Sequence, residues 1–389
     1  MVDYTPDPIH EDIREAVRTM CKAFPDEYWM EHDTNHEFPW EFYDAVAKGG
    51  WLGLTIPEEY GGGGLGVTEA AIVEQEISAS GAGMGGCSAV HIGIFGFEPI
   101  IHHGSTDLKQ RFLPRVVTGE LHTSFAVTEP DAGTDTTNIR TFAKKVDGGW
   151  LVSGKKVWIT KAQEAERMLL LCRTSPRDEN AKRTAGMTLM FAEMDRSKVQ
   201  IRPIPKMGRN AVDTNELFID DLFVADEDVV GEVGHGFRTI LGGLNAERVI
   251  SANAALGIGK AALRRGTEYA KQREVFGRPI GQNQGIAFQL AEAQIRLDAA
   301  EQMVQKAAWL VDQGMPCGRE ANAAKFLCAE AGFYAADVAL QVHGGFGYGK
   351  EFHVERYFRE ARLMRIAPIS QEMVLNYTAE HVLGLPRSY

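Results

Sequence analysis

The sequence predicts an α+β protein with an N-terminal helical domain, a middle antiparallel β-barrel domain and a C-terminal four-helix-bundle domain. Three observations predict this order: helical apolar spacing in the first part, short β-rich runs in the middle, and two long helical seams at the end. With 389 residues, the chain is long enough for two or three packed units. We therefore expect domains at 1–121, 122–232 and 233–389.

The N-terminal region should consist of short helices joined by glycine-rich turns. Residues Ile9–Phe24 and Trp40–Ala47 carry apolar side chains at the spacing of one helix face. Gly61–Gly64 is a run of four glycines, and Gly81–Gly86 is nearly as rich in glycine. Because glycine interrupts regular structure, we expect both glycine-rich segments to be loops.

The middle region changes to a β pattern. Its β-rich runs are short, are punctuated by glycine and aspartate, and have no helical segment between them, which favours an antiparallel barrel or sandwich. The runs are Ser124–Thr128, Trp150–Thr160, Met168–Cys172, Met187–Glu193, Val199–Pro203 and Glu216–Val224.

The C-terminal region returns to helical spacing. Apolar residues recur alternately four and three apart from Ile286 to Val311 and again from Ala324 to Val342. The segment Gly314–Gly318 separates the two seams. Two such seams joined by a short glycine-containing turn predict antiparallel helices of a bundle.

Composition excludes several classes of function. The formal net charge of −12 argues against nucleic acid or an anionic membrane as the main partner. The five cysteines are scattered and form no C-x-x-C pair, so we expect reduced thiols and no zinc site. His32 and His36 are four residues apart, but no third metal ligand has suitable spacing. The first residues lack the features of a signal or transit peptide, which predicts a cytoplasmic location.

Four motifs, in this order along the chain, carry a resemblance. They are Val127–Asp135 (VTEPDAGTD), Gly154–Thr160 (GKKVWIT), Arg273–Ile280 (REVFGRPI) followed by Gln284, and Gln341–Tyr348 (QVHGGFGY). Together they resemble the acyl-CoA dehydrogenase family over essentially the whole chain. The resemblance implies FAD as cofactor, an acyl-CoA substrate and a role in fatty acid metabolism. It also implies a homotetramer, built as a dimer of dimers with FAD sites shared between subunits, and an electron-transfer flavoprotein as partner.

The resemblance also implies the residues that bind the cofactor. Trp158 offers an aromatic face, and Thr128 and Thr160 offer hydroxyl and backbone groups to a flavin ring. Arg273 can neutralise a pyrophosphate bidentately, and by resemblance it acts on the FAD of a neighbouring subunit. The matching positions for FAD are Phe125, Val127, Thr128, Gly133, Thr134, Trp158, Thr160, Arg273, Phe276, Gln284, Gln341, Gly344, Gly345, Ser370 and Glu372.

Simpler interpretations of two of these motifs stay open. Trp158 and the strand threonines could serve only as core. Gly344 and Gly345 could form an ordinary helix C-cap, and a cap can coexist with phosphate binding at the same loop.

The catalytic base is the point at which this sequence departs from many family members. Removal of an α-proton needs a carboxylate, and the position that usually provides it near the C-terminus is Pro368 here. A subgroup that includes isovaleryl-CoA and long-chain dehydrogenases takes the base from an earlier helix, where Glu247 falls on the matching position. Thr134, Asn245 and Arg248 match positions that contact the CoA side of the substrate. The alternative is that Glu247 is an ordinary helix carboxylate paired with an arginine.

Other functions remain compatible with the same scaffold. The rivals are a flavin monooxygenase or oxidase, a desulfinase-like member, and a non-catalytic FAD-binding protein. The presence of a carboxylate at position 247 favours dehydrogenation over a desulfinase-like activity.

Overall fold

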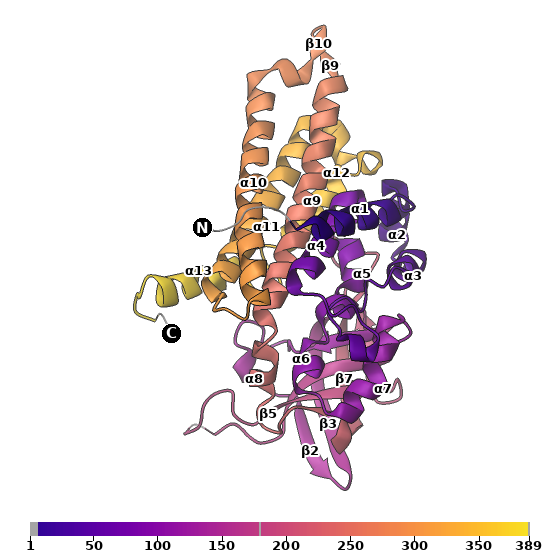
Figure 1. The fold of residues 1–389 in the computed structure, drawn as a ribbon, viewed down its shortest axis with the longest axis vertical. Coiled ribbons are helices and arrows are strands. Elements are labelled where there is room, and N and C mark those ends of the chain that lie inside the picture. Colours follow the sequence, from indigo (N-terminus) through magenta and orange to yellow (C-terminus); the bar gives the residue numbers. More distant parts are fainter. Residues whose placement is uncertain (1–6, 179, 388–389) are drawn as a thin grey trace.

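A computed structural model describes residues 7–178 and 180–387. Figure 1 shows the strands of the main sheet gathered at one end of an elongated molecule and the long helices rising from them to the other end. Helices come first, the main sheet follows, and the long helices complete the chain, so the predicted helical–β–helical fold class is confirmed.

The N-terminal region packs its helices around α4 and α5, which are almost wholly buried. The predicted turn at Gly81–Gly86 is wrong in its second half. Gly81 does break the helix, with φ of 116° in a π-helical turn, but Gly83 is the first residue of α5. Small glycines fit there because α5 lies deep in the core, with Gly86 facing Trp29. The helices are α1 (Pro8–Cys21), α2 (Asp26–Asn35), α3 (Trp40–Lys48), α4 (Val67–Ile77), α5 (Gly83–Phe95), α6 (Glu98–His103) and α7 (Thr106–Val117).

By length and composition alone, the helical stretch Val67–His103 could cross a membrane. Of the most apolar 18-residue segment in this stretch, 78% is buried inside the protein. Both α4 and α5 pack against a long helix of the bundle, which accounts for their apolar composition as core.

The middle region forms one sheet with the strand order β6-β7-β3-β2-β4-β5-β8. Its pairings are antiparallel except that β4 runs parallel to β1 and, at one residue pair, to β2. Strand β1 pairs with β4 off the main path, so the sheet is not uniformly antiparallel as expected. The strands are β1 (Thr123–Ala126), β2 (Phe142–Val146), β3 (Gly149–Thr160), β4 (Arg167–Arg173), β5 (Met187–Glu193), β6 (Val199–Pro203), β7 (Thr214–Ala225) and β8 (Val229–Val230).

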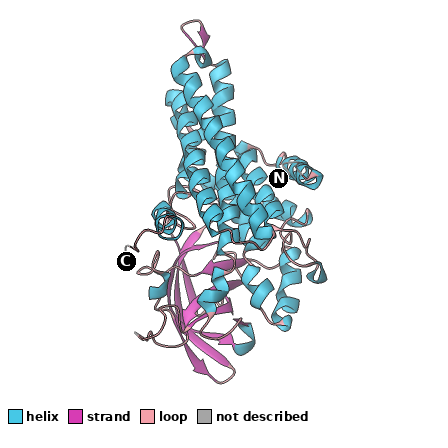
Figure 2. Ribbon diagram, turned by 60° about the vertical axis from the view of Figure 1, so that its left-hand side comes forward, coloured by secondary structure: helices cyan, strands magenta, loops and turns pink. Residues whose placement is uncertain are grey.

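Three long antiparallel helices form the bundle, and Figure 2 shows them extending away from the sheet. The short hairpin of β9 and β10 joins α9 to α10 at the far tip of the bundle. The C-terminal elements are α8 (Gly236–Leu241), α9 (Leu244–Gln272), β9 (Glu274–Val275), β10 (Arg278–Pro279), α10 (Gln284–Asp312), α11 (Gly318–His343), α12 (Val354–Leu363) and α13 (Gln371–Tyr377).

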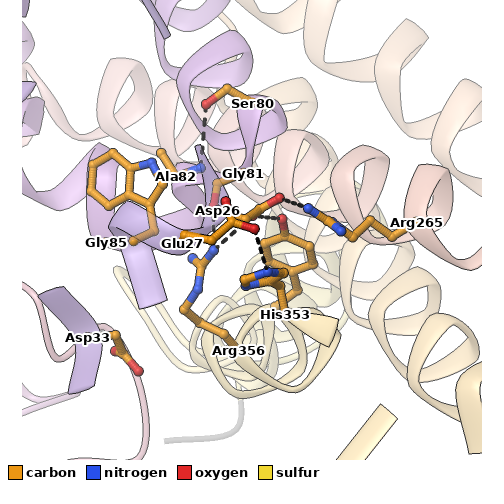
Figure 3. Close-up of polar contacts among 12 residues, drawn as sticks. Asp26, Glu27, Asp33, Ser80, Gly81, Ala82, Gly85, Arg265, His353 and Arg356 are labelled. Carbon is orange, nitrogen blue, oxygen red and sulfur yellow. Dashed lines mark hydrogen bonds and ion pairs between the residues drawn. The ribbon is translucent and has the colours of Figure 1, made fainter. Parts of the chain in front are cut away.

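A buried ion-pair network ties the N-terminal helices to the bundle (Figure 3). Asp26 of α2 accepts hydrogen bonds from Arg265 of α9 and from Arg356 and Tyr357 of α12. Arg356 also donates to the carbonyl of Gly81 at 2.6 Å, which fixes the break before α5. The network therefore sets where α4 and α5 lie relative to the bundle.

Close contact between α9 and α11 depends on glycine. A Cβ at Gly332 would lie 2.2 Å from the carbonyl oxygen of Ala255, and a Cβ at Gly259 would lie 2.7 Å from the Cα of Gly332. Neither backbone atom can move without shifting its helix, so these glycines set the separation of α9 and α11.

We expect Gly332→Ala to lower the free energy of unfolding by about 1–3 kcal/mol, because an added methyl group overpacks the helix contact. The measurement is denaturant unfolding with FAD in excess. Gly285→Ala is the matched control, since nothing lies within 4 Å of its Cβ position on α10. Equal midpoints for the two variants would contradict the proposed role of the close contact.

Candidate active site

Trp158 is exposed and strained. Its backbone has φ of 64°, a left-handed conformation that a bulky residue rarely adopts, and its side chain is 59% exposed. The strain falls where the register between β3 and β7 shifts, between Lys156 and Ile159. The interpretation of Trp158 as a core residue is therefore wrong. The strand instead presents an aromatic face to the outside, and such strain is concentrated at functional sites.

A buried ion pair holds the first two motifs together. Lys156 on β3 donates to the carbonyl of Val127 and to the carboxylate of Glu129, each at 2.9 Å. Next to it, the backbone N–H of Val157 donates to the carbonyl of Thr128 at 3.0 Å. These contacts bring Val127 and Thr128 beside the strand that carries Trp158.

The charges of this pair stay in place although both side chains are buried. Burial acts to raise the pKa of Glu129, but the charge of Lys156 and the hydrogen bonds from Thr141 and Arg140 outweigh it and hold this pKa below its ordinary value. The pair therefore stabilises the fold above the ordinary carboxyl range, and that stabilisation is lost as the pH falls through the lowered pKa.

The turn after β1 is open to a ligand. Gly133 and Thr134 are exposed, and nothing lies within 4 Å of a Cβ position at Gly133. Phe125 is half-buried on β1 and packs against the core beneath this turn. Phe125 on β1 and the segment that follows it, with Thr128 and Thr134, therefore lie beside the strand that carries Trp158, to which Thr128 is hydrogen-bonded through Val157.

Arg209 is a residue of this region that the sequence analysis missed. Its guanidinium is buried, and it donates to Thr160 at 3.3 Å and to Thr214 at 3.0 Å. Burial lowers the pKa of Arg209. A single arginine in a loop carries no distinctive sequence signal, and only the fold shows that it lies behind Thr160.

Glu247 lies in the first turn of α9 and is half-buried. Burial raises the pKa of its carboxyl, and the charges of His91 and Arg248 oppose this rise. Among the ion pairs of residues 7–178 and 180–387, none joins Glu247 to an arginine, and Arg248 donates instead to Asn245 at 2.8 Å. The alternative of an ordinary surface ion pair therefore finds no support. A carboxyl with a raised pKa suits proton transfer near neutral pH.

Lys325 and the start of α13 lie close to the first turn of α9. Lys325 of α11 is buried and donates to Gln371 at 3.2 Å, and burial lowers its pKa to about 8. The charges of Arg248 and Glu372 both act on Lys325, so the start of α13 lies near α9. Ser370 caps α13 by accepting a hydrogen bond from Met373 at 3.3 Å. The sequence analysis missed Lys325.

The third and fourth motifs, Arg273–Ile280 and Gln341–Tyr348, lie together at the end of the bundle that is far from the main sheet. The guanidinium of Arg273 lies 5.6 Å from the centre of the Phe346 ring. Gly344 is the C-cap of α11 with φ of 59°, so the C-cap interpretation is correct, and Gly344 and Gly345 are both open to solvent. Three more predicted FAD contacts, all exposed, are Phe276, Gln284 and Gln341.

Within one chain the two groups of predicted FAD contacts lie far apart. Glu247 and Arg273 stand near opposite ends of α9, which at 1.5 Å per residue separates them by about 39 Å. Figure 1 shows the β9–β10 hairpin and the main sheet at opposite ends of the molecule. Within one chain, the predicted pyrophosphate contact Arg273 therefore lies far from Glu247 and from the predicted flavin contacts on the main sheet.

A strained, exposed tryptophan, an open turn beside it and a half-buried carboxyl make up the candidate site of this helical–β–helical protein. The acyl-CoA dehydrogenase family models for the N-terminal, middle and C-terminal domains match residues 7–120, 124–222 and 234–383. The chain belongs to the acyl-CoA dehydrogenase family. It is an FAD-dependent enzyme, and the exposed ring of Trp158 and the open turn at Gly133 suit the binding of a flavin.

Relatives and solved structures agree with this assignment over nearly the full length. The acyl-CoA dehydrogenase FadE12 of Mycobacterium tuberculosis is 38% identical over 97% of this chain and 96% of its own length. Butyryl-CoA dehydrogenase from Megasphaera elsdenii matches with a TM-score of 0.92 and 29% identity, over 98% of this chain and all of its own. A structure from work on the electron transferring flavoprotein of Acidaminococcus fermentans matches with a TM-score of 0.91 and 28% identity, over 98% and 100% of the two chains.

We expect Glu129→Gln to destabilise the protein by about 3–5 kcal/mol and to lower FAD retention, because Lys156 would then be an unpaired buried charge. The measurements are denaturant unfolding and the ratio of bound FAD to protein. The double variant Glu129→Gln with Lys156→Met is the control and should recover much of the loss. If the single variant matches the unchanged protein in both measurements, the ion pair does not hold the flavin strand.

Proposed function

We propose that Glu247 is the base that removes the α-proton of an acyl-CoA thioester. The observation that carries the proposal is a half-buried carboxyl with a raised pKa at the start of α9. FAD, when bound, supplies the acceptor for the hydride from the β-carbon. The product of the paired proton and hydride loss is a trans-2-enoyl-CoA.

The raised pKa of Glu247 gives the proposed reaction its pH dependence. A base must be unprotonated, so the rate of flavin reduction should rise as the pH increases through the pKa of Glu247. The charges of His91 and Arg248 oppose the rise in the pKa of Glu247 that burial causes. They therefore keep the pH at which the rate increases from moving further upward.

Substrate contacts are proposed for the residues around the start of α9. Arg248 is held by Asn245, and together with the nearby cation of Lys325 it offers positive charge to an anionic CoA ligand. Thr134, in the open turn after β1, would contact the pantetheine or phosphate part of CoA. Chain length, branching and ring character of the acyl group stay open.

We also propose a homotetramer, built as a dimer of dimers with shared FAD sites. The support is the separation of Glu247 from Arg273 along α9, together with apolar side chains exposed on the bundle. Large exposed apolar patches indicate protein interfaces. Exposed apolar residues of the C-terminal region include Phe276 in the hairpin, Leu375 on α13 and, on the long helices, Phe288, Ile295, Trp309 and Leu327.

For re-oxidation we propose an electron-transfer flavoprotein as the acceptor, in the cytoplasm. The similarity to the structure associated with the Acidaminococcus fermentans flavoprotein supports this acceptor. An oxidase of the same fold would pass electrons to oxygen instead. Reduction by acyl-CoA without oxygen, followed by slow re-oxidation in air, would separate a dehydrogenase from an oxidase.

We expect Glu247→Gln to slow anaerobic flavin bleaching by acyl-CoA about 10²–10⁴-fold while FAD stays bound, because the variant lacks the proton acceptor. A panel of straight, branched and cyclic acyl-CoAs should be tested, with an artificial electron acceptor for turnover. Glu31→Gln, an exposed carboxylate on α2, is the control and should bleach normally. Full bleaching in the Glu247 variant would refute the assignment.

We expect mixed oligomers of Glu247→Gln and Arg273→Met chains to regain activity that neither variant has alone. In a dimer with shared sites, one site receives Glu247 from one chain and Arg273 from the other. The two chains can be co-expressed with different affinity tags and purified through both. If mixed oligomers stay as inactive as the parents, each site is built from a single chain.

A further inference from the structure

Arg209 joins three elements at the end of the strand that carries Trp158. It donates to the hydroxyl of Ser88 on α5 at 3.0 Å, to that of Thr160 at 3.3 Å and to that of Thr214 at 3.0 Å. Thr160 ends β3 and Thr214 begins β7, and the two threonines are direct partners in the pairing of these strands. One guanidinium group therefore bonds to neighbouring hydroxyls on two paired strands and to a helix of the N-terminal region.

The loop that carries Arg209 holds this residue in one place. Its backbone has φ of 61°, a left-handed conformation that is uncommon for residues other than glycine. Its carbonyl accepts hydrogen bonds from the Nζ of Lys206 at 2.7 Å and from the backbone N–H of Val212 at 3.3 Å. The next residue, Asn210, donates its backbone N–H to Asp33 of α2 at 2.8 Å. An unusual backbone conformation that is fixed from several sides in this way is typical of functional positions.

The positive charge of Arg209 has no direct counter-ion. All three of its hydrogen bonds to side chains go to uncharged hydroxyl groups. Among the ion pairs of residues 7–178 and 180–387 none includes Arg209, and within the same residues its shielded Nε has no hydrogen-bond partner. An arginine keeps its charge in proteins, and a cation shielded from water is costly without compensation. This charge can therefore stabilise a group that gains negative charge beside Thr160.

Two lysines near the same end of β3 are engaged elsewhere. Lys156 pairs with Glu129 at 2.9 Å. Lys161 directly follows Thr160, but its Nζ donates to the carbonyl of Ala89 at 3.2 Å. Of these three cations, the guanidinium group is thus the one that bonds to the hydroxyl of Thr160.

We propose that Arg209 is a positioning residue for the flavin, which prepares Thr160 as a hydrogen-bond donor and brings a fixed positive charge close to the ring. The hydroxyl oxygen of Thr160 accepts from the guanidinium, so its own hydrogen is left to donate to a ligand. A bond from a charged donor also polarises the hydroxyl and makes it a stronger donor in turn. The inference rests on the predicted contact of Thr160 with FAD, and it does not require Glu247 to be the base.

The charge of Arg209 should favour the reduced form of the cofactor. Transfer of a hydride from the substrate to FAD adds one negative charge to the ring, while the substrate proton goes to a base. A fixed cation in a site with little water stabilises that charge, so the midpoint potential of bound FAD should be higher with Arg209 than without it. A residue that only tied its loop to the sheet would change the stability of the protein and leave this potential unmoved.

The test measures the midpoint potential of FAD in the purified, FAD-loaded oligomer by reduction against a dye of known potential. We expect Arg209→Gln, which keeps hydrogen-bond donors but loses the charge, to shift the equilibrium toward oxidised FAD about tenfold, which is about 30 mV downward for a two-electron couple. Arg209→Lys keeps the charge and should retain most of the potential. Arg202→Gln is the matched control, because Arg202 is an exposed arginine on β6 and should leave the potential unchanged. An unmoved potential in Arg209→Gln, or equal losses in Arg209→Gln and Arg209→Lys, would overturn the proposal.

Thr160→Val tests the link itself, since it removes the hydroxyl and leaves the bonds of Arg209 to Ser88 and Thr214 in place. It should lower the potential as well, and the double variant with Arg209→Gln should fall by less than the sum of the two single shifts. Full additivity, or an unmoved potential in Thr160→Val, would refute an action of Arg209 through Thr160. If Arg209→Gln fails to retain FAD, the potentials of Thr160→Val and Arg209→Lys decide the question in the same way.

This potential separates the inference from the proposed function, because reduction against a dye needs neither an acyl-CoA nor a base. If no acyl-CoA bleaches the flavin but Arg209→Gln still lowers the potential, the proposed function fails and the role of Arg209 stands. If acyl-CoA bleaches the flavin normally but the potential of Arg209→Gln equals that of the unchanged protein, the role of Arg209 is refuted and the function stands.

Discussion

Helix α9 is the element on which the rest of the structure depends. It packs against α4 and α5 of the N-terminal region and against α10, α11 and α12 of the C-terminal region, so both regions contact this one helix. Its first turn carries Glu247 and its end leads to Arg273. Because one rigid helix fixes both residues, the distance between the proposed base and the proposed pyrophosphate contact is set by its length. This separation supports the proposal that two chains share each FAD site.

Buried charge fixes backbone segments in two parts of the molecule. Lys156 and Glu129 hold the strand that carries Trp158, and Asp26 with its arginine partners holds the start of α5 against the bundle (Figure 3). Buried ion pairs add little net stability relative to apolar packing, but breaking one is costly. Their value here is geometric, because each fixes the position of a backbone segment. The energy that such pairs cost must come from the extensive apolar core around α4 and α9.

The sequence predicts much of this fold because apolar periodicity is a local signal. The seams from Ile286 and Ala324 fall within α10 and α11, and the predicted β runs overlap six strands. Strand β2 was missed because its sequence, FAKKV, is mostly exposed and charged. The start of α5 was missed because glycine normally interrupts helices, whereas close packing favours it here.

The sequence predicts site residues only where they belong to a recognisable motif. Glu247 could be proposed because the resemblance to the family puts Pro368 at the usual base position and Glu247 at the alternative one. Arg209 and Lys325 had no such signal, since their importance comes from burial beside Thr160 and Arg248. Long-range contacts of this kind depend on how helices and strands pack, and a single sequence does not show them.

Local charge resolves the conflict between a net charge of −12 and ligands that are themselves anionic. The overall field repels an anion at long range, but salt screens it over about 8–10 Å. Within that range the cations Arg248 and Lys325 lie near the start of α9, and Arg273 lies at its end, where anionic ligands are proposed to bind. Because Arg248 and Lys325 are at least half-buried, water and salt screen them less than surface charges. A few well-placed cations can therefore outweigh the larger number of scattered surface carboxylates.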